Sequence, residues 1–276
     1  MAIANNPLKQ YFRRPSIYVR LPSGGKGYLP GVVNIPESGE LPIYPMTAID
    51  EITARTPDSL YNGTAVVELI KSCVPDIKDP WSIHSTDMDS ILIGIKSASQ
   101  GNELEIETEC PKCEEVSKFG VNLVAVLSTM KEADYEKELE ISDLGIKFRP
   151  LTYREMNEAN LKQFEIQRMF MSIESIENEE ERIKKTQEAI VSITQTTMDV
   201  LAKTIEYIRT PSAQVVDTNF ILDYLQNCDK NTYTTIRDYH SKMKEMTELK
   251  PLEIKCPHCS NEYKQPFILN TSDFFG

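Results

Sequence analysis

Two Cys-Pro-x-Cys motifs, far apart in the chain, hold the residues best suited to chemistry. They supply four thiols, from Cys110 and Cys113 in the first motif and from Cys256 and Cys259 in the second. A structural zinc ion takes four ligands in a tetrahedron, and cysteine thiolates at about 2.3 Å are a usual ligand set. The sequence therefore predicts a four-cysteine site for structural Zn²⁺ that joins the middle of the chain to its C-terminal part.

Alternating apolar and polar residues flank each motif and predict a strand on either side of it. Residues 104–108 precede and 119–123 follow the first motif, while 252–255 precede and 263–269 follow the second. A period of two is typical of a half-buried strand. We therefore expect two zinc knuckles, each made of a strand, a tight turn with two thiols and a returning strand.

The four thiols leave alternatives open. Iron can occupy the same four sulfurs, and a single Cys-x-x-Cys can be a redox pair or a disulfide. Two matching hairpins favour structural metal over a redox pair, and residues 1–7 lack the basic-then-apolar pattern of a secretory signal. Four cysteines fill the shell, so hydrolysis at the metal is not expected. His258 is interpreted as a bystander, and Cys73 and Cys228 as core residues.

Little in the sequence supports catalysis, and we predict that the chain is not an enzyme. The histidines are His84, His240 and His258, and none belongs to a His-Glu-x-x-His motif. The sequence also contains no Gly-x-Ser-x-Gly elbow and no dinucleotide-binding fingerprint. An undetected pair of carboxylates is the least favoured alternative, because nothing positive supports it.

Composition and charge exclude some partners. Apolar runs such as residues 91–95 are too short to span a membrane. The net charge is −12, which disfavours nucleic acid as a partner. Residues 1–36 nevertheless contain five bases and no acid, which leaves 25 bases against 42 acids in the rest. A basic arm on an acidic body predicts docking onto an acidic neighbour, including a second copy of the chain, with a solvated arm as the alternative.

The two aromatic residues at the end of the C-terminal tail predict an interaction site there. In the tail, folding back into the protein's own core is the alternative. The predicted partner-binding residues are Phe12, Arg13 and Arg14 in the arm, and Phe274 and Phe275 in the tail.

The remaining patterns divide the chain into four parts and predict an α+β fold. The parts are an N-terminal arm and β-hairpin over 1–44, a helical segment with the first knuckle over 45–127, a helical insertion over 128–250, and the second knuckle with the tail over 251–276. A small zinc-ribbon module with an N-terminal hairpin and helices is thus interrupted, between its knuckles, by a long helical insertion.

Capping boxes and apolar spacing predict the individual helices. The N-terminal half is expected to hold helices over 47–55, 58–73 and 86–99. In the insertion, one helix begins at the capping box of Thr152 and Glu155, a second runs to about Arg209, and two more cover 217–228 and 231–249. The second of these helices has an expected seam of Ile190, Ile193, Thr197, Leu201, Thr204 and Ile208.

Several segments resemble a known family. They are Asn6–Ser23, Tyr44–Ala48 with Thr56–Gly63, and Ser72–Ile77 followed by the first Cys-Pro-x-Cys motif. Over about the first 125 residues the chain resembles the baseplate hub and baseplate hub assembly proteins of contractile-tailed bacteriophages.

The resemblance implies a structural or assembly role in the virion tail baseplate, contacts with other phage tail and baseplate proteins, and no catalytic residues. It also implies assembly in the bacterial cytoplasm, where thiolates on zinc are expected rather than disulfides. The alternative function is that of a nucleic-acid-binding zinc-ribbon protein, such as a transcription factor. The many acids around the knuckles disfavour it.

Overall fold

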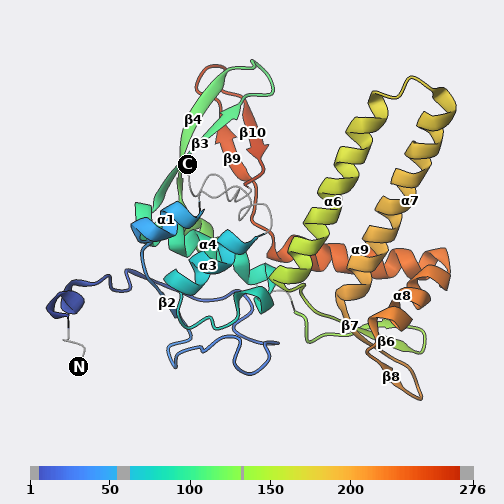
Figure 1. The fold of residues 1–276 in the computed structure, drawn as a ribbon, viewed down its shortest axis with the longest axis horizontal. Helices are drawn as coiled ribbons and strands as arrows, with labels where there is room; N and C mark the ends of the chain where they lie inside the picture. The colour runs from blue at the N-terminus through green and yellow to red at the C-terminus, as the bar shows by residue number, and fades with distance from the viewer. Residues whose placement is uncertain (1–5, 55–62, 132–133, 268–276) are drawn as a thin grey trace.

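The computed structural model describes residues 6–54, 63–131 and 134–267 of the chain. Over these ranges the fold is mixed α+β, with antiparallel sheets only: three sheets of two strands and one of four. The four-stranded sheet and the long helices of the insertion lie beside an N-terminal body (Figure 1).

The N-terminal body packs a small sheet against two buried helices. Its elements are η1 (Pro7–Tyr11), β1 (Ile17–Val19), β2 (Leu41–Ile43), α1 (Ala48–Ala54), α3 (Thr64–Cys73), η2 (Pro80–Ser82) and α4 (Ser85–Gln100). Ile43, Ile70 and Ile95 are among the fully buried side chains of its core. The helices α1, α3 and α4 begin and end within six residues of the predicted bounds. The largest difference, at the start of α3, adjoins residues outside the described ranges.

The strands of the N-terminal hairpin, β1 and β2, are antiparallel and are joined by a long connection. The glycine-rich segment after β1 does not return the chain directly, because β2 comes only at residue 41. Instead, the buried carboxylate of Asp87 in α4 accepts a hydrogen bond from the Ser23 amide at 2.8 Å and one from the Tyr28 hydroxyl at 2.6 Å. This segment is therefore a wide loop that is held by α4.

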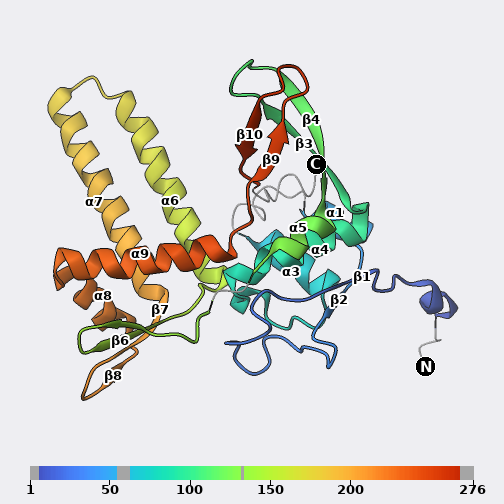
Figure 2. The same ribbon diagram turned by 180° about the vertical axis from the view of Figure 1, so that it is seen from behind.

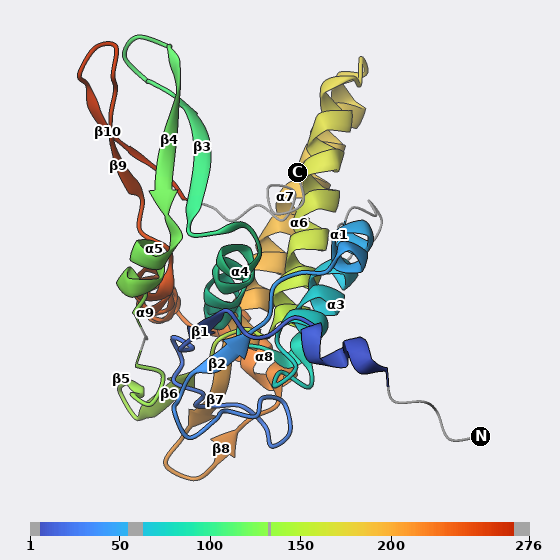
Figure 3. The ribbon, with the colours of Figure 1, turned by 90° about the vertical axis from the view of Figure 1, so that its left-hand side faces the viewer.

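The two cysteine motifs lie at the turns of two β-hairpins, as predicted. The first hairpin consists of β3 (Glu103–Glu109) and β4 (Val116–Asn122), and the second of β9 (Leu252–Lys255) and β10 (Glu262–Gln265). Figures 1 and 3 show the two hairpins side by side, projecting from the N-terminal body. The short helix α5 (Leu123–Thr129) follows β4. A small apolar cluster of Ile93, Val121, Leu123 and Phe267 connects the bases of the hairpins to α4.

The insertion contains a sheet that the sequence did not predict as a whole. It consists of β5 (Leu139–Ile141), β6 (Leu144–Phe148), β7 (Ile205–Arg209) and β8 (Gln214–Val215), in that order. The helices are α6 (Tyr153–Glu174), α7 (Glu179–Lys203), α8 (Thr218–Asn227) and α9 (Lys230–Thr247). Buried side chains of the sheet and helices, including Ile146, Phe148 and Ile236, form a second hydrophobic core.

The prediction of a helix that runs to about Arg209 was wrong. Helix α7 ends at Lys203, Thr204 is its C-cap, and residues 205–209 pair with β6 as strand β7. The physical reason is the run of β-branched residues Thr204, Ile205 and Ile208, which favours an extended backbone when a partner strand is present. The expected seam is also not buried along its length, since Ile190 is 54% exposed.

The pair α6 and α7 projects from the rest of the insertion as a helical hairpin (Figures 1 and 2). The capping box at its start is present as predicted, because Thr152 Oγ1 accepts from the Glu155 amide and the Glu155 carboxylate accepts from the Thr152 amide. Among the described residues, no helix is long and apolar enough to cross a membrane.

Candidate metal centre

The first cysteine turn is a compact loop stabilised by backbone hydrogen bonds. The amide of Cys110 donates to the carbonyl of Glu115 at 3.1 Å, and the amide of Glu114 donates to the carbonyl of Cys110 at 2.9 Å. Glu114 has φ of +58°, in the left-handed region that costs a non-glycine residue of order 1 kcal/mol or more. This conformation reverses the chain directly after the second thiol, Cys113.

The second cysteine turn repeats the first residue for residue. The amide of Cys256 donates to the carbonyl of Asn261 at 2.8 Å, and that of Ser260 donates to the carbonyl of Cys256 at 2.9 Å. Ser260 has φ of +57°, at the position that corresponds to Glu114. Two unrelated residues adopt the same unfavourable conformation, which indicates that the geometry of the thiols determines the turn.

The two turns bring all four sulfurs together, with their Sγ atoms within 4.8 Å of one another. The Sγ atoms of Cys110 and Cys259 lie 3.7 Å apart, and those of Cys113 and Cys256 are separated by the same distance. Four ligands at about 2.3 Å around a tetrahedral zinc ion are separated by about 3.8 Å. The sulfur positions therefore fit a tetrahedral metal ion, and they are too far apart for a disulfide, whose sulfurs are about 2.05 Å apart.

The thiols are largely shielded from water. Cys110 and Cys256 are 1% and 2% exposed, and Cys113 and Cys259 are half-buried. Burial opposes ionisation of Cys110, yet hydrogen bonds from the amides of Lys112 and Cys113 outweigh it and lower the pKa of this thiol. The amide of Glu115 favours the Cys113 thiolate, but burial and the three neighbouring sulfurs raise its pKa. Four thiolates at this spacing need a cation among them.

Contacts between the hairpins surround the sulfurs. Thr108 Oγ1 in β3 donates to Gln265 Oε1 in β10 at 2.9 Å, and Asn261 Nδ2 in the second turn lies 3.9 Å from the sulfur of Cys110 in the first. With four protein sulfurs in the shell, a bound zinc ion would have no position left for water or substrate. The arrangement is that of a structural site, which would crosslink the two hairpins.

The predicted partner-binding residues lie in different environments. Phe12 is 58% exposed and Arg14 is also exposed. The guanidinium of Arg13 is instead bound within its own chain, where it donates to the carbonyls of Pro45 and Ser72 at 2.5 Å and 2.8 Å. Phe274 and Phe275 lie outside the described residues. Partner binding by all five residues stays a prediction.

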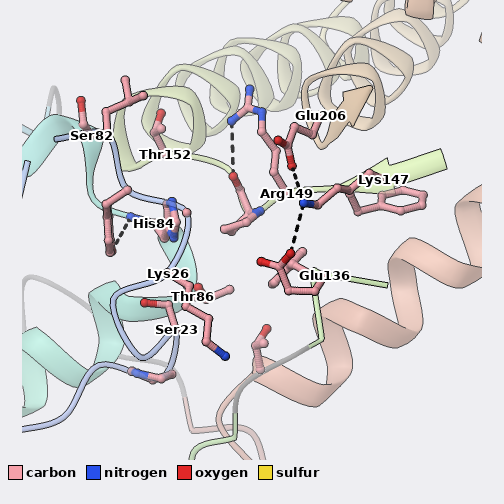
Figure 4. Close-up of a pocket in the computed structure, with 18 of the residues that line it drawn as sticks. Ser23, Lys26, Ser82, His84, Thr86, Glu136, Lys147, Arg149, Thr152 and Glu206 are labelled. Carbon is pink, nitrogen blue, oxygen red and sulfur yellow. Dashed lines mark hydrogen bonds and ion pairs between the residues drawn. The ribbon is translucent and has the colours of Figure 1, made fainter. Parts of the chain in front are cut away.

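A cavity of about 380 Å³, which the sequence did not reveal, lies between the loop 22–29 of the N-terminal body and strand β6 of the insertion (Figure 4). Lys147 at its wall pairs with Glu136 at 3.3 Å and with Glu206 at 3.6 Å. His84 stacks on Tyr28, and burial lowers the pKa of the imidazole to about 4. No local spacing could have marked this cavity, because its walls come from segments far apart in the sequence.

A protein-family model described as T4 bacteriophage base plate protein matches residues 16–276. The chain belongs to this family and is therefore a component of the virion tail, where other tail proteins are its neighbours. The predicted resemblance to a baseplate family is confirmed, and the match extends through the insertion and the second cysteine hairpin. Among curated proteins and solved structures, no match was found.

Proposed function

We propose that this chain is a structural component of the hub region of a contractile phage tail baseplate, held in shape by a zinc ion on four cysteines. The observation that carries the proposal is the cluster of four sulfurs from two distant hairpins in a chain of the baseplate family. A rigid crosslink suits a protein that must keep its shape in a large assembly. In this role the chain catalyses no reaction and acts through contacts with other proteins.

Zinc is the proposed metal, because it prefers closed tetrahedral thiolate sites and remains redox-inactive. Iron in the same four sulfurs would give a coloured, redox-active centre. Metal analysis and the absorption spectrum of the purified protein separate the two. Stoichiometric zinc without visible absorption supports the proposal, and stoichiometric iron contradicts this part of it.

A role in nucleic-acid binding, the other function that a zinc ribbon permits, is disfavoured by the charge of the first hairpin. Lys118 in β4 pairs with Glu105 at 2.8 Å and with Glu107 at 3.2 Å. Its charge is therefore neutralised locally rather than offered to phosphates. Retention of the purified protein on DNA that weakens steeply with salt would favour this alternative instead.

The role in the baseplate is tested with phage that carries a tagged copy of the chain. Mass spectrometry of purified mature tails should detect the chain, and a knockout should yield no complete baseplates. A Cys259→Ser copy should fail to rescue the knockout, whereas a Cys228→Ser copy, which alters a thiol outside the cluster, should rescue it. Absence of the chain from mature tails would contradict a permanent hub subunit and would leave a transient role in assembly.

A further inference from the structure

The N-terminal arm, defined here as residues 6–14, is a folded segment with an apolar surface that no other part of the described ranges covers. Its 3-10 turn η1 is capped by Asn6, whose Oδ1 accepts from the amide of Leu8 at 2.9 Å, and contains no buried residue. Leu8, Tyr11 and Phe12 are 61%, 78% and 58% exposed. A single helical turn has little stability alone, and a partner that covers its apolar side chains would stabilise it. The exposed apolar surface therefore indicates that the arm is a docking segment.

The root of the arm is anchored, while the arm itself points outward. Besides its bonds to two carbonyls, Arg13 donates to Ser72 Oγ at 2.7 Å and forms an ion pair with Asp50 at 3.2 Å. In Figures 1 and 2, η1 lies at one end of the longest axis of the molecule, next to the N label. The arm thus leaves an anchored root and points away from the body.

The hairpin tip, defined here as residues 171–183, lies toward the opposite end of this axis (Figures 1 and 2) and has apolar side chains that are exposed within the described part of the chain. Ile173 of α6 and Ala189 of α7 are buried. Met171 lies two residues before Ile173, hence about 200° around the helix, and is 72% exposed. Ile183, close to the start of α7, is 53% exposed. Both helices therefore present an apolar side chain to solvent beside the loop that joins them.

The charges of the arm and of the hairpin tip are complementary. The arm contains the exposed bases Lys9 and Arg14 and no acid. The hairpin tip has one exposed base, Arg182, and five exposed acids: Glu174, Glu177, Glu179, Glu180 and Glu181. Within the described ranges, none of the five acids forms an ion pair, unlike the acids of the first cysteine hairpin. The arm therefore carries a net positive charge, and the hairpin tip carries a net negative one.

We propose that the arm of one copy docks on the hairpin tip of a second copy of this chain. In this contact, Leu8, Tyr11 and Phe12 cover the apolar side chains of the tip, and the two exposed bases of the arm, Lys9 and Arg14, face its acids. An arm and a tip at opposite ends of one molecule cannot meet within it. The contact is therefore head-to-tail, and it builds a ring when the rotation between copies closes and a filament when it does not.

The contact is small, and this sets its expected strength. A segment of a few residues buries less than the roughly 1,200 Å² at the lower limit of stable interfaces. Association is therefore expected to be weak in solution, to increase with protein concentration, and to weaken with salt as the opposite charges are screened. The inference rests on the proposed baseplate role, since an array of copies in a tail would make many weak contacts effective.

Sedimentation of the metal-loaded full chain over a range of concentrations tests the inference. Wild type should self-associate at low salt. An arm variant, Leu8→Ala with Tyr11→Ala, and a tip variant, Glu179→Gln with Glu180→Gln and Glu181→Gln, should each weaken self-association at least about tenfold. Mixing the two variants should restore one intact contact, between the arm of the tip variant and the tip of the arm variant. The mixture should therefore form a one-to-one heterodimer and nothing larger.

Two control variants remove similar groups from another surface. Phe220→Ala in α8, where Phe220 is 67% exposed, and Glu245→Gln in α9 should associate like wild type. Circular dichroism should show that all variants are folded, because every altered side chain is exposed. The inference is overturned when wild type stays monomeric at all concentrations, when the mixture of variants stays monomeric, or when the controls dissociate equally. A monomeric chain that is still present in purified tails would overturn self-docking and leave the baseplate role intact.

Discussion

The Sγ atoms of Cys110 and Cys259 lie 3.7 Å apart, although 149 positions separate the two residues in the sequence. A crosslink that closes a loop of this length removes chain entropy equivalent to about 5 kcal/mol. Metal ligation by a structural cysteine site supplies about 10 kcal/mol or more at neutral pH. The free energy of metal ligation therefore exceeds the entropic cost of closing the loop. A metal ion can thus hold the two hairpins together across the whole insertion.

Loss of one cysteine ligand should remove the metal and loosen both hairpins. In Cys113→Ser, three sulfurs remain, and we expect substoichiometric zinc and a loss of about 3 kcal/mol or more in the free energy of unfolding. Metal analysis and urea denaturation measure the two effects. Cys228→Ser is the matched control, because Cys228 lies at the end of α8, outside the cluster. A Cys113→Ser protein with full metal content and wild-type stability would contradict the site.

Removal of the metal should unfold the chain locally. The core of the insertion, which includes Phe148 and Ile236, does not share residues with the apolar cluster below the cysteine hairpins. After chelation, hydrogen exchange should accelerate in β3, β4, β9 and β10, while β6 and α9 stay protected. Readdition of zinc should restore protection. Equal acceleration in all strands would show instead that the metal supports one cooperative unit.

The two cysteine turns were predictable from sequence because the signal of each is local. Each Cys-Pro-x-Cys motif sits between alternating runs, so each hairpin can be read from about twenty consecutive residues. The capping box of Thr152 and Glu155 is equally local. No local pattern shows that the two turns lie together. Their proximity was predicted because one tetrahedral zinc ion takes four ligands and each turn offers two thiols.

Strand β7 and the position of Arg13 depend on partners that are distant in the sequence. Residues 205–209 continue a helical apolar spacing, and only their pairing with β6 makes them a strand. From the sequence, Arg13 is interpreted as one of several bases in a basic arm. In the structure, its hydrogen-bond partners lie 32 to 60 positions further along the chain. No pattern within the arm distinguishes it from Arg14.

Glu155 should stabilise the insertion in a pH-dependent manner. Partial burial opposes its ionisation, but hydrogen bonds from Arg149 and from the Thr152 amide outweigh burial and lower the pKa of its carboxyl group. Because the folded-state pKa lies below the ordinary value of about 4.3, Glu155 stabilises the fold at neutral pH. This contribution is lost as the pH falls through the folded-state pKa.

Urea denaturation at neutral and acidic pH measures this contribution. Glu155→Ala should cost about 2 kcal/mol at neutral pH, because it removes both the cap and a partly buried ion pair. Glu155→Gln keeps the capping acceptor and should cost less. The difference between wild type and Glu155→Ala should shrink in acid. Glu158→Gln, which breaks an exposed pair with Lys203, should stay within about 0.5 kcal/mol. A pH-independent effect of Glu155→Ala would contradict the ion pair.

Gly94 lets α4 approach the small sheet of the N-terminal body. A Cβ at this position would collide with the Cδ1 atom of Ile43 and come within 2.8 Å of the Cγ2 atom of Val19, and both side chains are buried. Gly94→Ala should therefore cost about 1–3 kcal/mol, despite a gain of about 1 kcal/mol in helix propensity. Thermal unfolding measures the change. Gly120→Ala in the exposed part of β4, where the nearest atom is 3.5 Å away, should be tolerated. Equal effects of both substitutions would contradict close packing at Gly94.

Arg13 and Arg14, adjacent in the arm, should contribute very differently to stability. Arg13→Ala leaves two carbonyls without a donor and the carboxylate of Asp50, whose side chain is 11% exposed, without its ion-pair partner. We expect a cost of about 2–4 kcal/mol in the free energy of unfolding. Arg13→Lys should recover only part of it, because an ammonium group cannot replace the planar fork of a guanidinium.

Arg14→Ala should change stability by less than about 0.5 kcal/mol, because its side chain is exposed and donates one long hydrogen bond, at 3.5 Å, to the carbonyl of Gln10. Urea denaturation of the three variants tests both expectations. Equal stability of Arg13→Ala and wild type would show that the root of the arm is not anchored there. This comparison also guides any binding experiment: a defect of Arg13→Ala in tail incorporation reports a displaced arm, whereas a defect of Arg14→Ala, in a chain of wild-type stability, reports a lost contact with a partner.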